Sequence, residues 1–172
     1  MSVKTVLSFV LTGALFLSPW VNAGHPGEEA GEMEMDHGTV SVPAGVRAPE
    51  LAIDLYPDNM DGYNLKLVVN HFTIIPPLES LIKGSAANVV EGHAHLYVNG
   101  KKIQRVYSLF THLPAKLFRN GINAITLSLN DHNHAAWTVG KSEIQATLTV
   151  NVGREPLVLN HFSSSPIRKR PH

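Results

Sequence analysis

Two histidines one residue apart, His93 and His95, are the residues whose types and spacing most directly suggest chemistry. They lie in EGHAHLYVNG, residues 91–100, where apolar residues alternate as in a β-strand that ends in an Asn-Gly turn. Side chains at i and i+2 of a strand share one face, with Cβ atoms roughly 6 to 7 Å apart, so both imidazoles can bind one metal ion. The alternative is that one ring hydrogen-bonds a backbone carbonyl and the other is half exposed.

Further histidines lie where connecting segments can bring them close to this pair. His112 follows the return strand of the predicted hairpin, and His132 and His134 come just after the strand that ends at Leu129. Neutral imidazole binds copper, zinc and nickel, so these ligands alone do not select a metal. The alternatives are that His112 caps local backbone and that the other two are solvated turn residues.

Methionines in polar surroundings favour copper among these metals. Met60 lies in a turn rather than in an apolar stripe. The acidic segment 24–38 has no core for its Met33 and Met35 to fill, and it also contains His37. Thioether sulfur beside imidazole selects Cu(I), and zinc is the weaker alternative. The segment equally fits a disordered, solvating acidic arm.

The first 23 residues have the pattern of a cleaved signal peptide. Lys4 precedes a short apolar run, and Val21-Asn22-Ala23 is the small-residue pattern of a cleavage site. Cleavage there would leave His25 second in the chain, where amine, amide and imidazole nitrogens chelate Cu(II). We therefore expect a periplasmic or secreted protein. The apolar run is too short for a membrane span, and no later segment is long and apolar enough.

Composition limits the remaining possibilities. The chain has no cysteine, so neither a disulfide nor a thiol site is available, and a packed core must stabilise the exported domain. The 14 basic and 14 acidic residues balance, which argues against a nucleic-acid partner. Nucleophile and phosphate-binding motifs are absent from the sequence. The ten histidines are the unusual feature.

The apolar alternation predicts an all-β fold. About seven short strands separated by turns favour an antiparallel, immunoglobulin-like β-sandwich. We expect this sandwich to occupy residues 39–153, between the disordered N-terminal arm at 24–38 and a basic C-terminal tail at 154–172. Because Ala94, Leu96 and Val98 predict the core face, the histidine face would lie outside or under a loop.

Several motifs together resemble a known family. These are Asp58-x-Met60-x-Gly62-Tyr63-Asn64, the block from Gly92 to Gly100, His112-Leu113-Pro114, and Leu129-Asn130 before an Asn-x-His turn. The chain resembles, over residues 50–152, small exported bacterial sandwich domains known as uncharacterised or proposed copper-binding proteins. The resemblance implies that Met60, His93, His95, His112 and His134 belong together. It departs at Asn133, where the family has an aspartate that could orient the last ligand.

These observations lead to three functional hypotheses. The first is a periplasmic copper-binding protein for metal handling, without catalysis, in which His93 and His95 bind from a strand. The second is an immunoglobulin-like module that binds an envelope protein partner and no metal. The third is a copper redox enzyme resembling superoxide dismutase, against which the missing cysteines and histidine-rich zinc loop count.

Overall fold

The computed structural model describes residues 38–78 and 90–163. In these ranges β-strands are the main regular structure, with one short 3₁₀ helix, η1 (Ala115–Leu117), and a helical pair of residues at 77–78. The first strands are β1 (Thr39–Ser41), β2 (Glu50–Pro57), β3 (Tyr63–Asn70), β4 (Phe72–Ile74), β5 (Val90–Val98) and β6 (Lys101–Val106). The others are β7 (Phe110–Leu113), β8 (Gly121–Asn130), β9 (Ala136–Val139), β10 (Ser142–Glu143), β11 (Gln145–Val152) and β12 (Val158–Ser163).

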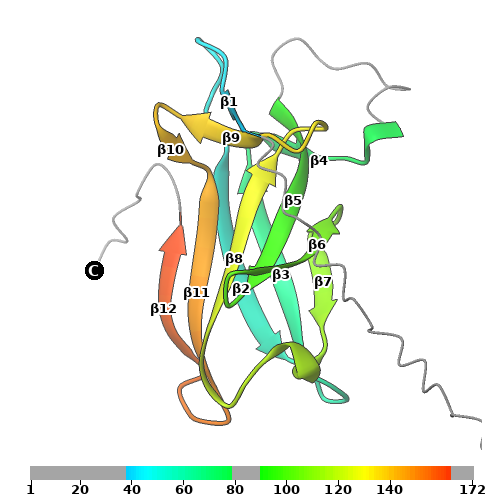
Figure 1. The fold of residues 1–172 in the computed structure, drawn as a ribbon, viewed down its shortest axis with the longest axis vertical. Helices are drawn as coiled ribbons and strands as arrows, with labels where there is room; N and C mark the ends of the chain where they lie inside the picture. Colours follow the sequence, from blue (N-terminus) through cyan, green and yellow to red (C-terminus); the bar gives the residue numbers. More distant parts are fainter. Residues whose placement is uncertain (1–37, 79–89, 164–172) are drawn as a thin grey trace, which may run out of the picture. The chain divides into compact units, whose positions relative to one another are not determined.

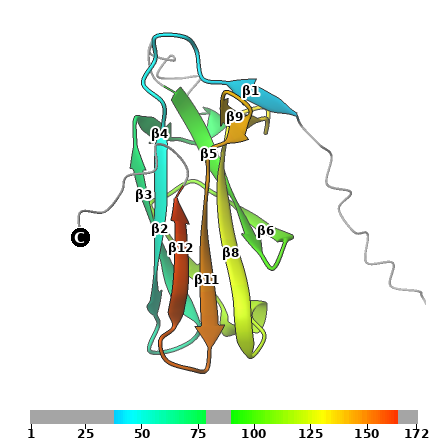
Figure 2. The same ribbon diagram turned by 90° about the vertical axis from the view of Figure 1, so that its left-hand side faces the viewer.

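The strands form two packed sheets (Figures 1 and 2). The larger sheet contains the path β1-β9-β8-β11-β12, and β5 joins it by pairing with β8, β6 and β4. The smaller sheet has the order β2-β3-β7. The predicted all-β sandwich is thereby confirmed.

The sandwich differs from the prediction in its details. The described residues contain twelve strands rather than about seven, because strands of two to four residues are too short to show a period. Two pairs, β1 with β9 and β4 with β5, are parallel, so the fold is not purely antiparallel. β3 and β4 are separated at His71, which has a φ of 56°, and β4 pairs with β5 rather than continuing the smaller sheet.

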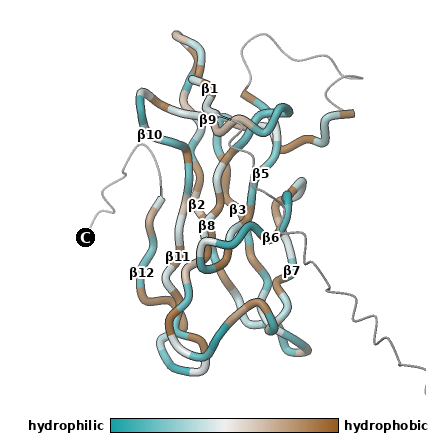
Figure 3. The backbone as a smooth tube through the Cα atoms, viewed as in Figure 1, coloured by the Kyte–Doolittle hydropathy of each residue, from teal (hydrophilic) through white to brown (hydrophobic). Residues whose placement is uncertain are grey.

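The core lies between the facing sheets. Alternate residues of each long strand point inward, so apolar and polar residues alternate along the strands in Figure 3. The larger sheet contributes inward side chains from β5, β8 and β11, and the smaller sheet contributes them from β2 and β3. These buried residues include Ala94, Leu96, Ile125, Leu127, Leu129, Ala146, Leu148, Leu51, Ile53, Leu65 and Leu67. The other face of β5 therefore points away from the core.

The predicted Asn-Gly hairpin is present between β5 and β6. Asn99 and Gly100 have φ values of 53° and 81°, as a two-residue turn with positive φ at both positions requires. The Asn99 side chain also donates to Asn123 Oδ1 at 2.8 Å and accepts from the Ala124 N–H at 3.0 Å. These contacts hold the end of β5 against β8.

At the chain ends, the sheet extends further than predicted. β12 pairs with β11 from Ala146 to Val150, with a bulge between Thr149 and Val150, so residues 158–163 of the expected C-terminal tail belong to the sheet. The predicted signal peptide, residues 24–37 of the predicted acidic arm and the basic residues Arg168 to Arg170 lie outside the described residues. No helix in the described ranges is long and apolar enough to cross a bilayer.

Candidate metal centre

The candidate site lies on the face of the larger sheet that points away from the core. His93 and His95 leave β5 on this face, opposite Asn130 and Ser128 of the neighbouring strand β8. An outward sheet face is normally wet, but the two histidines have 0% and 2% of their surface exposed. The β8–β9 loop brings His134 against both rings, and the Tyr107 ring lies 5.1 Å from that of His93. The structure thus has buried histidines outside the apolar core.

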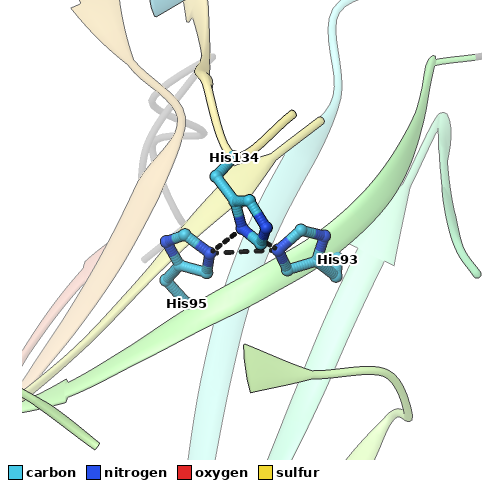
Figure 4. Close-up of side chains that lie close together, drawn as sticks. All are labelled: His93, His95 and His134. Carbon is cyan, nitrogen blue, oxygen red and sulfur yellow. Dashed lines mark hydrogen bonds between the residues drawn. The ribbon is translucent and has the colours of Figure 1, made fainter. Parts of the chain in front are cut away.

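Three ring nitrogens from two distant segments converge at one point (Figure 4). His93 Nε2 lies 3.0 Å from His95 Nε2, and each lies 3.2 Å from His134 Nδ1. Among the described histidines, cysteines and carboxylates, these three residues form the one group close enough to share a metal ion. His93 and His95 are buried and His134 is half-buried.

The triangle of nitrogens has the size that a transition-metal ion requires. Separations of 3.0 to 3.2 Å place each nitrogen about 1.8 Å from the centre of the triangle, so an ion with bonds of about 2.0 to 2.1 Å would lie about 1 Å above its plane. The angles between its bonds would be about 100°, close to tetrahedral. The three histidines therefore fit as one face of a tetrahedron, with a fourth position open.

The protons of neutral rings cannot satisfy all three nitrogen contacts at once. A nitrogen that carries a hydrogen donates but does not accept, so three mutually close nitrogens always leave one pair of like groups facing each other. Facing lone pairs, buried away from water, are unfavourable. A cation at the centre would accept electron density from all three, which is the physical reason to interpret the group as a metal centre.

Burial keeps the strand histidines in the neutral form that binds metals. Burial lowers the pKa of His93 to about 4, helped by the positive charges that His134 and Arg105 can carry. Burial likewise lowers the pKa of His95 to about 3, helped first by Lys102. At neutral pH both rings are uncharged, so protons do not compete for the nitrogens that would bind an ion.

The β8–β9 loop is held by its own hydrogen bonds. Asp131 Oδ1 accepts from the N–H groups of Asn133 at 2.9 Å and Ala135 at 2.8 Å. The His134 N–H donates to the Asp131 carbonyl at 3.1 Å, and His134 takes a φ of 71°, which is unusual for histidine. Asn133, at the position where the resembled family has aspartate, is exposed and contributes its backbone N–H. The loop therefore fixes His134 through Asp131.

A second set of polar contacts ties His134 to the sheet. Asn130 Nδ2 donates to the His134 carbonyl at 2.9 Å, and Ser128 Oγ donates to Asn130 Oδ1 at 2.8 Å. Ser128 and Asn130 are buried and stand directly opposite His95 and His93. His134 is thus held by a side chain of β8, the strand that pairs with β5. Because β5 carries His93 and His95, all three ligands depend on this one strand pair.

Gly92 allows the two strands to approach at this point. Its φ is 147°, in a region that favours glycine, and a Cβ placed on it would lie 2.0 Å from the Asn130 carbonyl oxygen. Any side chain here would push against the backbone of the residue that anchors His134. Gly92 is therefore part of the construction of the site.

The structure brings together three of the predicted ligands and leaves two elsewhere. His112 is on β7 of the smaller sheet, opposite Asn64, with its Nε2 4.0 Å from Asp61 Oδ2. Met60 is in the β2–β3 turn and is 94% exposed, with its N–H donating to Asp58. Neither residue is part of the histidine group, because the strand and the turn that carry them belong to the other sheet.

The remaining sequence candidates fall into two classes. His132 lies on the same loop as His134, but its Nε2 is directed toward Glu91, 3.6 Å from Oε1. His25, Met33, Met35 and His37 lie outside the described residues. Sequence reasoning assigned no role to four residues that shape the site: Gly92, Ser128, Asn130 and Asp131. Only Asp131 could have been recognised from its neighbours, because Asp-x-Asn is typical of an Asx turn.

Comparison with known proteins assigns no family to this chain. No family model, no curated protein and no solved structure matches it. The functional argument therefore depends on the chemistry of the histidine group.

Proposed function

We propose that this chain is an exported metal-handling protein that binds copper through His93 Nε2, His95 Nε2 and His134 Nδ1. The observation that carries the proposal is the convergence of these three nitrogens, 3.0 to 3.2 Å apart, on a buried part of a sheet face that points away from the core. The N-terminal signal pattern supports export to the periplasm or beyond.

The choice of copper is based on the three imidazole nitrogens and not on methionine sulfur. Met60, the one methionine among the described residues, lies in an exposed turn of the other sheet, so the described part of the chain offers no thioether to this group. Three neutral imidazoles bind Cu(II) most tightly among the divalent first-row ions, and they also suit Cu(I). Zinc fits the same triangle, so the affinity of the two metals must be compared directly.

Handling, rather than catalysis, agrees with how the third ligand is placed. His134 is half-buried and lies on a loop, whereas His93 and His95 are buried on a strand. Because His134 is half-buried, an ion can reach and leave the centre from the side of the loop. Such exchange is what a carrier or a storage protein requires.

Copper titration of the mature protein tests the proposal. Every protein in the titration, wild type included, carries His25→Ala, so that a copper chelate at the new N-terminus does not contribute to the measured affinity. We expect one tightly bound copper ion, at least a 100-fold loss of affinity in His95→Ala, and no change in the matched control His112→Ala, which removes an exposed histidine. Equal affinity in His95→Ala would refute the centre.

Competition with zinc tests the choice of metal separately. Tighter binding of zinc than of Cu(II) or Cu(I) would refute copper but keep the metal centre. A ligand that binds only the native state must raise the melting temperature. A melting temperature that does not change when any of these metals is added would instead favour the second hypothesis, a module that binds a protein partner and no metal.

A further inference from the structure

The three ligands leave the charge of a bound ion uncompensated. Imidazoles that coordinate are neutral, and the described residues place no carboxylate in the histidine group. A divalent ion there keeps its full charge in a buried place, where isolated charge is costly. Its open fourth position is therefore the natural place for a negative ligand.

Strand β6 adds positive charge on the same face. Arg105 pairs directly with His95, so the two side chains leave the sheet on one side, and Lys102 pairs in the same way with Tyr97 after a bulge. Both side chains therefore stand on the sheet face that carries the histidine group.

These two cations have no acidic partner in the described part of the chain. The ion pairs found there join His112 to Asp61 and His132 to Glu91, and neither includes Lys102 or Arg105. Lys102 is half-buried and Arg105 is exposed, so both cations can contact an anion that enters from solvent. A bound metal would raise the local positive charge further.

We infer that the metal bound at this centre takes a small inorganic anion as its fourth ligand, recognised by Lys102 and Arg105. The inference rests on the proposed metal binding. The anion must be small because His134 and Tyr107 crowd the group, with ring centres 4.9 Å and 5.1 Å from His93. A guanidinium offers two parallel donors to an oxyanion, and an ammonium adds a point charge.

Azide binding to the copper(II)-loaded protein, in the His25→Ala background, tests this inference. Azide reports coordination through a new charge-transfer absorption band and a changed electron paramagnetic resonance spectrum. We expect saturable binding that weakens about tenfold in Lys102→Ala and about tenfold in Arg105→Ala. Lys101→Ala is the matched control, because this exposed lysine pairs with Val98 and belongs to the opposite face.

The outcomes separate this inference from the proposed function. Copper bound with normal affinity, but with no azide signal, would mean a closed coordination sphere and would overturn the inference alone. Azide binding equal in wild type, Lys102→Ala and Arg105→Ala would overturn the role of the two cations. Loss of copper binding itself would overturn the proposed function and the inference with it. If zinc is the metal, the protein is loaded with cobalt(II) in place of zinc, and azide binding is followed by the change in the visible absorption of cobalt(II).

Discussion

Substituting Gly92 by alanine should damage the metal centre without removing any ligand. The new Cβ would lie 2.0 Å from the Asn130 carbonyl oxygen, so strand β8 or β5 must move by more than about 1 Å to restore a normal contact. Asn130 holds the His134 carbonyl, so this movement displaces one nitrogen of a triangle with sides of only 3.0 to 3.2 Å.

The expected magnitude has two parts. The unfavourable φ costs about 1–3 kcal/mol, and the forced packing costs about 1–3 kcal/mol, so we expect Gly92→Ala to lose about 2–6 kcal/mol of unfolding free energy. For metal binding, we expect a loss of about 10- to 100-fold in affinity, the range found when groups that orient a ligand are removed.

Gly100→Ala is the matched control for this experiment. Gly100 also has a positive φ, 81°, but a Cβ there meets nothing within 4 Å. It should lose about 1–2 kcal/mol of stability and keep its metal affinity. Urea unfolding of the apo proteins measures stability, and copper competition under conditions where both variants are folded measures affinity. Unchanged affinity in Gly92→Ala, or equal losses in both variants, would refute the argument that Gly92 positions the site.

Three further predictions concern the same centre. Because the unfolded chain protonates histidine near pH 6.5 and the folded chain protonates His93 and His95 only near 4 and 3, apo stability should fall as pH drops below 6.5, by about 2 kcal/mol for each ring at pH 5 in urea unfolding. A flat stability between pH 7 and 5 would contradict this assignment. Asp131→Ala removes two loop hydrogen bonds and should lower copper affinity about tenfold with a stability loss of about 1–3 kcal/mol, measured by competition and unfolding. Copper at 100 times its Kd should stabilise the folded chain by about 2.7 kcal/mol in thermal melts, and His134→Ala should abolish that gain while His112→Ala keeps it.

The elements that sequence analysis predicted correctly are those whose residue pattern can be recognised within a short stretch of the sequence. Apolar core residues recur at every second position in β2, β5, β8 and β11, as in Leu51, Ile53 and Leu55 of β2, and this period is visible in the sequence itself. The Asn99-Gly100 turn depends on two residue types that accept positive φ. Short strands such as β4 and β9 depend on partners far along the chain, so no local pattern indicates them.

Which histidines meet depends on sheet membership, and this is where sequence reasoning is weakest. His112 and His134 each follow a predicted strand in the sequence, so their positions along the chain do not show which of them reaches the pair on β5. However, β7 pairs with β3 and carries His112 into the smaller sheet, whereas β8 pairs with β5 and brings the following loop over His93 and His95. That difference arises from strand pairing, which composition and spacing do not encode.

The choice between His132 and His134 shows how a single turn can decide a ligand. Both lie on one loop, two residues apart, and spacing alone cannot separate them. Asp131 accepts from the backbone on both sides of His134, which fixes that residue at a φ of 71° and directs its ring to the centre, while the ring of His132 is directed to Glu91. An extended conformation at residue 134 would break this turn and move the third nitrogen away, so the centre requires a positive φ that residues other than glycine adopt uncommonly.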